Sequence, residues 1–279
     1  TVHGQPHADP LARWAAYVDQ NANGLVEDAE ILLAVAMWAS GQNVPGEAEV
    51  VSDAMVQTLL TLWVTGRPHY GTLTAESSAE LAASWFDLAG RLVRELRLSP
   101  PVASRVYGYL GVTLYEAVFN GMSGFGTLAG QVGGLPHPPG FQVGAVYPWP
   151  VVANAALGEV ARALFDGSTA EFEIATLHAR WAAQHEAQYA AAAVARAQAR
   201  GRALGATLAA WSRTDGYGAL DGCAYTPPQG RGLWAPTLPH HAPALQPCWG
   251  QLRPFALTAH DACQPAPPPA YAEARGTAF

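Results

Sequence analysis

The sequence predicts an all-α protein, in which a small helix pair precedes a larger helical-bundle domain with long loops rich in proline and glycine. Three observations carry this prediction. Apolar side chains recur at three- and four-residue steps in successive segments, which is the spacing of one helix face. Half of the 279 residues are apolar, which is enough for a sizeable core. The first two helical segments also form an internal repeat.

Composition and charge exclude some classes of partner. Charged residues make up only 13% of the chain, the net charge is −7, and all 15 basic residues are arginine. Without a basic patch, nucleic acid is not an expected partner. The longest apolar run near the start, residues 31–39, is far shorter than the roughly 20 residues of a membrane span.

The sequence says less about the cellular location and the oligomeric state of the protein. The sequence shows no signal peptide, but it begins at Thr1 rather than Met, which is consistent with a removed export signal. We therefore expect an extracellular or periplasmic protein. The sequence leaves open whether the chain is a monomer or a homo-oligomer.

The most specific chemical pattern is DQNANGLVEDAE, residues 19–30, which matches the twelve-residue EF-hand calcium loop position by position. The predicted calcium ligands are the oxygen atoms of Asp19, Asn21, Asn23, Leu25 (backbone carbonyl), Glu27 and Glu30. Gly24 stands at the sharp turn of the loop. Calcium takes six to eight oxygen ligands, and the two neutral asparagines predict a modest affinity. The alternative is an Asx-rich turn before a helix.

A helix is expected at residues 28–40, and its pattern recurs 25 residues later. The matched pairs include Val26 and Val51, Asp28 and Asp53, Ile31 and Val56, Val35 and Leu60, and Trp38 and Trp63. The second copy keeps the apolar positions but lacks the ligands. This arrangement resembles an EF-hand pair or a dockerin-type module, and we assign it to residues 1–70. Calcium would either stabilise this small helix pair or support docking to a partner.

The second domain, residues 71–279, is expected to begin with helices at 77–96 and 99–120. The latter is apolar around nearly its whole circumference, so we predict that it lies at the centre of the bundle. An irregular segment, 121–147, separates it from a helix at 150–165. Ser168 and Glu171 form a capping-box pattern that opens a long helical run to about residue 211. We expect a break in this run near Gly201.

Two histidines lie on this long run. His178 and His185 are two turns apart, and a metal site would need a third ligand such as Glu171 or Glu186. Histidines packed in the core or lying on the surface are the favoured alternative. Beyond residue 215 the sequence is proline-rich and extended, and its histidines accompany no recognised catalytic framework.

The three cysteines show no metal-ligand spacing. In an exported protein, Cys248 and Cys263 could form a disulfide and leave Cys223 free. Three isolated thiols are the favoured reading.

Four blocks occur in a fixed order: SPPVASRVYGYLGVTLYEAV, YPWPVVANAALGEV, TDGYG with the downstream YTPPQGRGLWAPT, and ALQPCWGQLRPFAL followed by PPPAY. Over residues 79–279 the chain resembles the N-terminal helical half of a vanadium-dependent haloperoxidase-like protein. This family lies in the type-2 phosphatidic-acid phosphatase superfamily. The resemblance implies an all-α fold and a site that binds vanadate for halide oxidation, or phosphate for ester hydrolysis.

In that family the oxyanion site comes from three C-terminal motifs: a Lys with Arg-Pro seven residues on, a Pro-Ser-Gly-His element, and a Ser-Arg element followed by Gly-x-His. None is present, because the chain has no lysine and no Ser-Gly-His sequence, and Gln246 stands seven residues before Arg253. No catalytic residue and no vanadate ligand can therefore be assigned here.

The sequence thus predicts a fragment that carries the scaffold half of such an enzyme. Its partners would be calcium and the missing C-terminal half of the same fold, and vanadate or phosphate would bind only in the full-length parent. One alternative is a calcium-dependent docking or structural module with a non-catalytic helical domain. The other is an acid-phosphatase-like phosphoester hydrolase.

Overall fold

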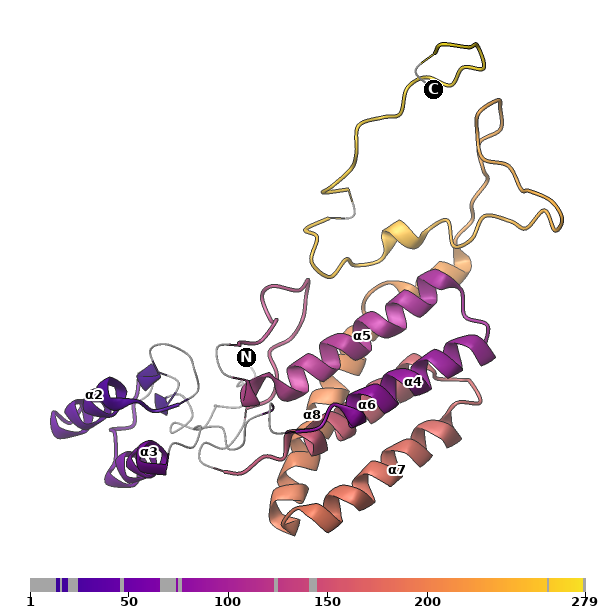
Figure 1. Cartoon of the computed structure of the whole chain (residues 1–279). Coiled ribbons are helices and arrows are strands. Elements are labelled where there is room, and N and C mark those ends of the chain that lie inside the picture. The colour runs from indigo at the N-terminus through magenta and orange to yellow at the C-terminus, as the bar shows by residue number, and fades with distance from the viewer. Residues whose placement is uncertain are drawn as a thin grey trace, which may run out of the picture.

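The computed structural model describes residues 14–15, 17–19, 25–45, 48–65, 74, 77–122, 125–140, 145–259 and 261–277. Within these residues the fold is all-α, as the sequence predicts, and β-structure is confined to two isolated bridges (Figure 1). The α-helices are α2 (Asp28–Ala39), α3 (Asp53–Thr65), α4 (Glu80–Glu95), α5 (Pro100–Val118), α6 (Trp149–Leu164), α7 (Glu171–Gln188) and α8 (Ala191–Arg213). No helix in these ranges has both the length and the apolar character needed to cross a bilayer.

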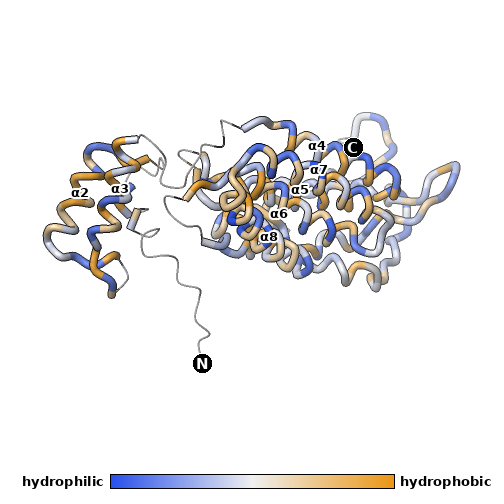
Figure 2. The backbone as a smooth tube through the Cα atoms, turned by 90° about the horizontal axis from the view of Figure 1, so that it is seen from below, coloured by the Kyte–Doolittle hydropathy of each residue, from blue (hydrophilic) through white to orange (hydrophobic). Residues whose placement is uncertain are grey.

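Helices α2 and α3 form a small core of their own and carry long hydrophobic stretches (Figure 2). Two reciprocal hydrogen bonds join them. Trp38 Nε1 donates to Asp53 Oδ1 at 2.7 Å, and Trp63 Nε1 donates to Asp28 Oδ1 at 2.9 Å. Each repeat therefore supplies the tryptophan that binds the other repeat's aspartate, so the sequence repeat of 25 residues is also a structural one. The predicted domain boundary near residue 70 lies outside the described residues.

The larger core is built around α6. Eleven of its sixteen residues are buried, and it packs against α4, α5, α7 and α8 (Figure 1). The prediction that the helix of residues 99–120 occupies the centre is wrong, because only eight of the 19 residues of α5 are buried and Tyr107 is 38% exposed. Small residues such as Ala155, Ala156 and Gly158 make α6 narrow, and this allows its neighbours to approach closely.

The long helical run after residue 168 differs from the prediction at two points. It breaks at Tyr189 and Ala190, between α7 and α8, and Gly201 lies inside α8. Ser168 does not cap the helix; its Oγ accepts a hydrogen bond from the backbone N–H of Ala170 at 3.2 Å. Gly201 is instead a packing residue, because it lies directly against the backbone of α6.

The contact between α6 and α8 predicts the effect of adding one methyl group. A Cβ on Gly201 would collide with the backbone carbonyl of Val152 and the side chain of Ala155. We expect Gly201→Ala to lower the free energy of unfolding of the larger domain by about 1–3 kcal/mol in urea titrations. Gly111→Ala in α5 is the matched control, because a Cβ there meets nothing within 4 Å. Equal stability of the two variants would contradict the packing role.

Candidate functional site

The predicted calcium loop lies partly in the described residues. Asp19 and Glu30, its first and last ligands, are only 7% and 5% exposed. Leu25 is half-buried and Glu27 is exposed, whereas Asn21 and Asn23 lie outside the described residues. In the described part of the chain, no three His, Cys, Asp or Glu side chains are grouped to hold a metal ion.

The end of the loop is fixed by the start of α2. The Glu30 carboxylate accepts a hydrogen bond from the backbone N–H of Glu27 at 3.0 Å. The Glu27 side chain accepts a hydrogen bond from the Glu30 backbone N–H in return, so the two residues form a capping box at the start of α2. The predicted ligand set consists of oxygen atoms, which is the donor type that Ca²⁺ takes.

The corresponding part of the second repeat is closed by backbone hydrogen bonds. Val44 N–H donates to the Glu49 carbonyl at 2.8 Å, and Val51 N–H donates to the Gln42 carbonyl at 3.0 Å. Both valines are buried. This loop reaches its shape through backbone hydrogen bonds and apolar packing, which agrees with its lack of metal-ligating side chains.

A buried polar cluster, which we call the α5 clamp, comprises Arg105, Tyr109, Asp215 and Arg253. Asp215 Oδ2 lies 2.6 Å from Arg105 Nε and accepts a hydrogen bond from the Tyr109 hydroxyl at 2.9 Å. Arg253 donates to the Tyr109 oxygen at 3.2 Å and to the Trp211 carbonyl at 2.8 Å. Burial and the neighbouring Asp215 carboxylate raise the pKa of Tyr109. The members of the clamp bind one another, which is the arrangement of a structural anchor.

The segment that contributes Arg253 to the clamp also contains a disulfide, which differs from the expectation. Cys223 is bonded to Cys248, with their Cα atoms 6.4 Å apart, whereas Cys263 is free and exposed. Both readings of the cysteines, three isolated thiols and a Cys248–Cys263 pair, are therefore wrong. The backbone N–H of Arg253 donates to the Asp215 carbonyl at 2.9 Å. The chain around Arg253 therefore lies against the turn that follows α8.

Two further buried charged residues, Glu116 and Arg200, each bind the irregular segment between α5 and α6. Glu116 accepts hydrogen bonds from the Leu128 N–H at 2.6 Å and the Thr127 hydroxyl at 2.9 Å. Arg200 donates to the Gly140 carbonyl at 2.6 Å and to Asn120 Oδ1 at 2.7 Å. Burial raises the pKa of Glu116 and lowers that of Arg200 to about 10. Sequence reasoning missed these two residues, although Glu116 and Arg105 are the only charged residues between Pro100 and Asn120.

The two histidines of α7 do not form a metal site with described residues. His185 is 2% exposed, and its ring lies 5.8 Å from that of Trp181 and 6.1 Å from that of Tyr189, between centroids. His178 packs near Gly158 of α6. Burial lowers the pKa of both histidines. The favoured prediction of packed histidines agrees with their position.

No protein-family model and no curated protein matches the sequence. Among solved structures, one described as the first bacterial vanadium-dependent iodoperoxidase is similar, with a TM-score of 0.63 and 25% sequence identity. The match covers 70% of this chain and 46% of that protein, so the chain spans about half the length of the iodoperoxidase. The chain therefore contains a haloperoxidase-like helical fold.

The buried histidines predict how stability depends on pH. A histidine whose pKa is below its ordinary value of 6.5 in the folded state binds a proton more readily in the unfolded chain. Stability should therefore be complete above about pH 6.5 and decrease as the pH falls through the lower, folded pKa. We expect His185→Phe, which keeps a ring between Trp181 and Tyr189, to reduce the drop in melting temperature from pH 7.5 to pH 5. The exposed His240→Gln is the control, and an equal drop in all three proteins would contradict the assignment.

Proposed function

We propose that this chain is the scaffold half of a vanadium-dependent haloperoxidase-like enzyme, preceded by a calcium-binding module. The observation that carries the proposal is the likeness of the fold to the iodoperoxidase, which extends over 46% of that protein. The four ordered sequence blocks from residue 99 onward support the same conclusion. The scaffold would position a catalytic half that supplies the oxyanion ligands.

The described residues do not fit vanadate. A tetrahedral oxyanion requires converging cationic and N–H donors, and the family adds a histidine. The buried guanidinium groups of Arg105, Arg200 and Arg253 are already bonded to carboxylate, carbonyl, amide or hydroxyl oxygens. His185 is enclosed by aromatic rings. We therefore derive no catalytic step within this chain.

The proposed partner is the missing C-terminal half of the same fold. Beyond α8, residues 224–245 extend away from the helices as an arm (Figure 1), whereas the segment after them returns to the bundle, where Arg253 bonds to Tyr109 and the Trp211 carbonyl. Large apolar side chains on this arm are exposed, among them Trp234 at 50%, Leu238 at 79% and Leu245 at 60%. Such exposure in a folded protein is typical of a surface that another unit covers.

The scaffold proposal predicts that activity depends on the other half. We expect this chain alone to show no vanadate-dependent oxidation of iodide by peroxide, measured as triiodide absorbance, because it lacks the oxyanion ligands. Activity should appear when the downstream polypeptide is joined to it or added in trans. Vanadate-dependent turnover by the chain alone would contradict the proposal, as would a downstream sequence without the three motifs. Hydrolysis of p-nitrophenyl phosphate in place of iodide oxidation would assign the parent to the phosphatases.

We also propose that the first module binds one calcium ion through the six oxygen ligands of residues 19–30. Two features support this: the match to the loop pattern and the burial of Asp19 and Glu30. The ion would stabilise the helix pair, whose core is small. This role is favoured over docking, which would require a partner and loss of its binding on chelation.

The calcium proposal predicts a specific loss on changing the last ligand. We expect Glu30→Gln to weaken calcium binding by at least about tenfold in calorimetric titrations, because the site loses a charge and a bidentate oxygen pair. Glu49→Gln, in the second repeat, is the matched control and should bind as the wild type does. A chelator should lower the melting temperature of the first module only. Equal heats for Glu30→Gln and wild type would exclude the ligand assignment.

A further inference from the structure

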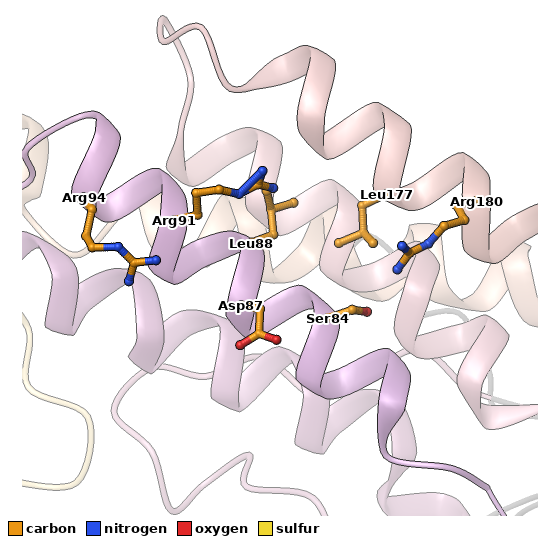
Figure 3. A pocket seen from close by; sticks show the side chains of 7 residues that line it. All are labelled: Ser84, Asp87, Leu88, Arg91, Arg94, Leu177 and Arg180. Carbon is orange, nitrogen blue, oxygen red and sulfur yellow. The ribbon is translucent and has the colours of Figure 1, made fainter.

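A groove lies between α4 and α7 on the surface of the larger domain (Figure 3). Its volume is about 430 Å³, and Arg91 and Arg94 of α4 and Arg180 of α7 line it. A second hollow of about 210 Å³ shares Arg91 and Arg180 with it and continues along α7 to Phe172. Together these hollows fall within the size range of small-molecule sites.

The groove combines an apolar floor with a cationic rim. Leu88 of α4 is buried and Leu177 of α7 is half-buried, and both line the groove. Figure 3 shows the side chains of Arg91 and Arg180 extending toward each other across these leucines, while Arg94 lies one turn further along α4. A ligand in this groove would contact hydrocarbon on one side and guanidinium groups on the other.

The charge balance of the groove favours an anion. Arg91 pairs with Glu173 at 2.7 Å, but Arg94 and Arg180 make no ion pair with any carboxylate in the described ranges. Asp87 is the other acidic residue on the rim. Three arginines thus face two carboxylates in a chain whose net charge is −7. Because one guanidinium group can bind two oxygens of a carboxylate, sulfonate or phosphate, the unpaired Arg180 can hold one such head group.

We propose that this groove binds a small amphipathic oxyanion, namely an aryl or short-alkyl carboxylate, sulfonate or phosphate ester. Its apolar part lies on Leu88 and Leu177, and its anionic head binds the unpaired guanidinium group of Arg180, with Arg91 across the groove. The site is independent of the proposed scaffold role, because it uses α4 and α7 only. Arg91 and Arg94 lie on the exposed side of α4, and only the approach of α7 turns that side into a groove.

The proposal is tested by calorimetric titration of the full chain with four probes. Phenyl phosphate and benzenesulfonate carry both features and should bind. Inorganic phosphate lacks the apolar part and benzyl alcohol lacks the charge, so each should bind at least about tenfold more weakly than the aromatic anions. Binding of the aromatic anions should also weaken as salt is raised, because the arginines are exposed.

Substitutions test the cationic rim and the apolar floor of the groove separately. Arg180→Gln should weaken both aromatic anions by at least about tenfold, whereas Arg213→Gln, an exposed arginine at the end of α8, should leave them unchanged. Leu177→Asn should weaken phenyl phosphate but not inorganic phosphate. The proposal is overturned if neither aromatic anion binds at millimolar concentration, if inorganic phosphate binds as tightly as phenyl phosphate, or if Arg180→Gln binds like the wild type. None of these readouts depends on vanadate, peroxide or the catalytic half.

Discussion

The backbone contact between α6 and α8 is the constraint on which the rest of the larger domain depends. Gly201 and Gly205 of α8 lie so close to α6 that a Cβ at either position would collide with it. This proximity carries Arg200, the neighbour of Gly201, into the bundle, where it reaches the carbonyls of the segment before α6. It also places the end of α8 beside α5, so that Asp215 can meet Arg105 and Tyr109.

Buried charges then hold the segments that have no regular secondary structure. A buried ion must be paired or hydrogen-bonded, and removing its partner is costly. Arg105 anchors the turn after α8, and Glu116 anchors the loop after α5. The long loops rich in proline and glycine are thus attached to the helices by a few directional contacts. These contacts explain how the helical core holds the irregular segments in defined positions.

The polar groups that stabilise the fold differ from those that we propose to bind ligands. The interior polar groups bind one another, so they are suited to hold the fold rather than to react. The ligand sites that we propose lie elsewhere, at residues 19–30 of the first module and in the arginine-lined groove of α4 and α7. The likeness to the iodoperoxidase concerns the helical framework and about half of that protein's length. A scaffold of this kind can be stable on its own while its chemistry requires residues from another segment.

The sequence by itself determined the all-α class, the positions of the helices and the repeat that pairs Trp38 with Trp63, because local periodicity and spacing encode these features. It also contains a signal at Arg105 and Glu116, the only charged residues between Pro100 and Asn120. Only the tertiary structure decided that α6 is central, that the long run breaks at Tyr189, and that Cys223 pairs with Cys248. Periodicity shows which side of a helix is apolar, but not how closely two helices approach. Pairings between residues distant in the chain follow from that approach, and small residues such as Gly201 control it without any hydrophobic signal.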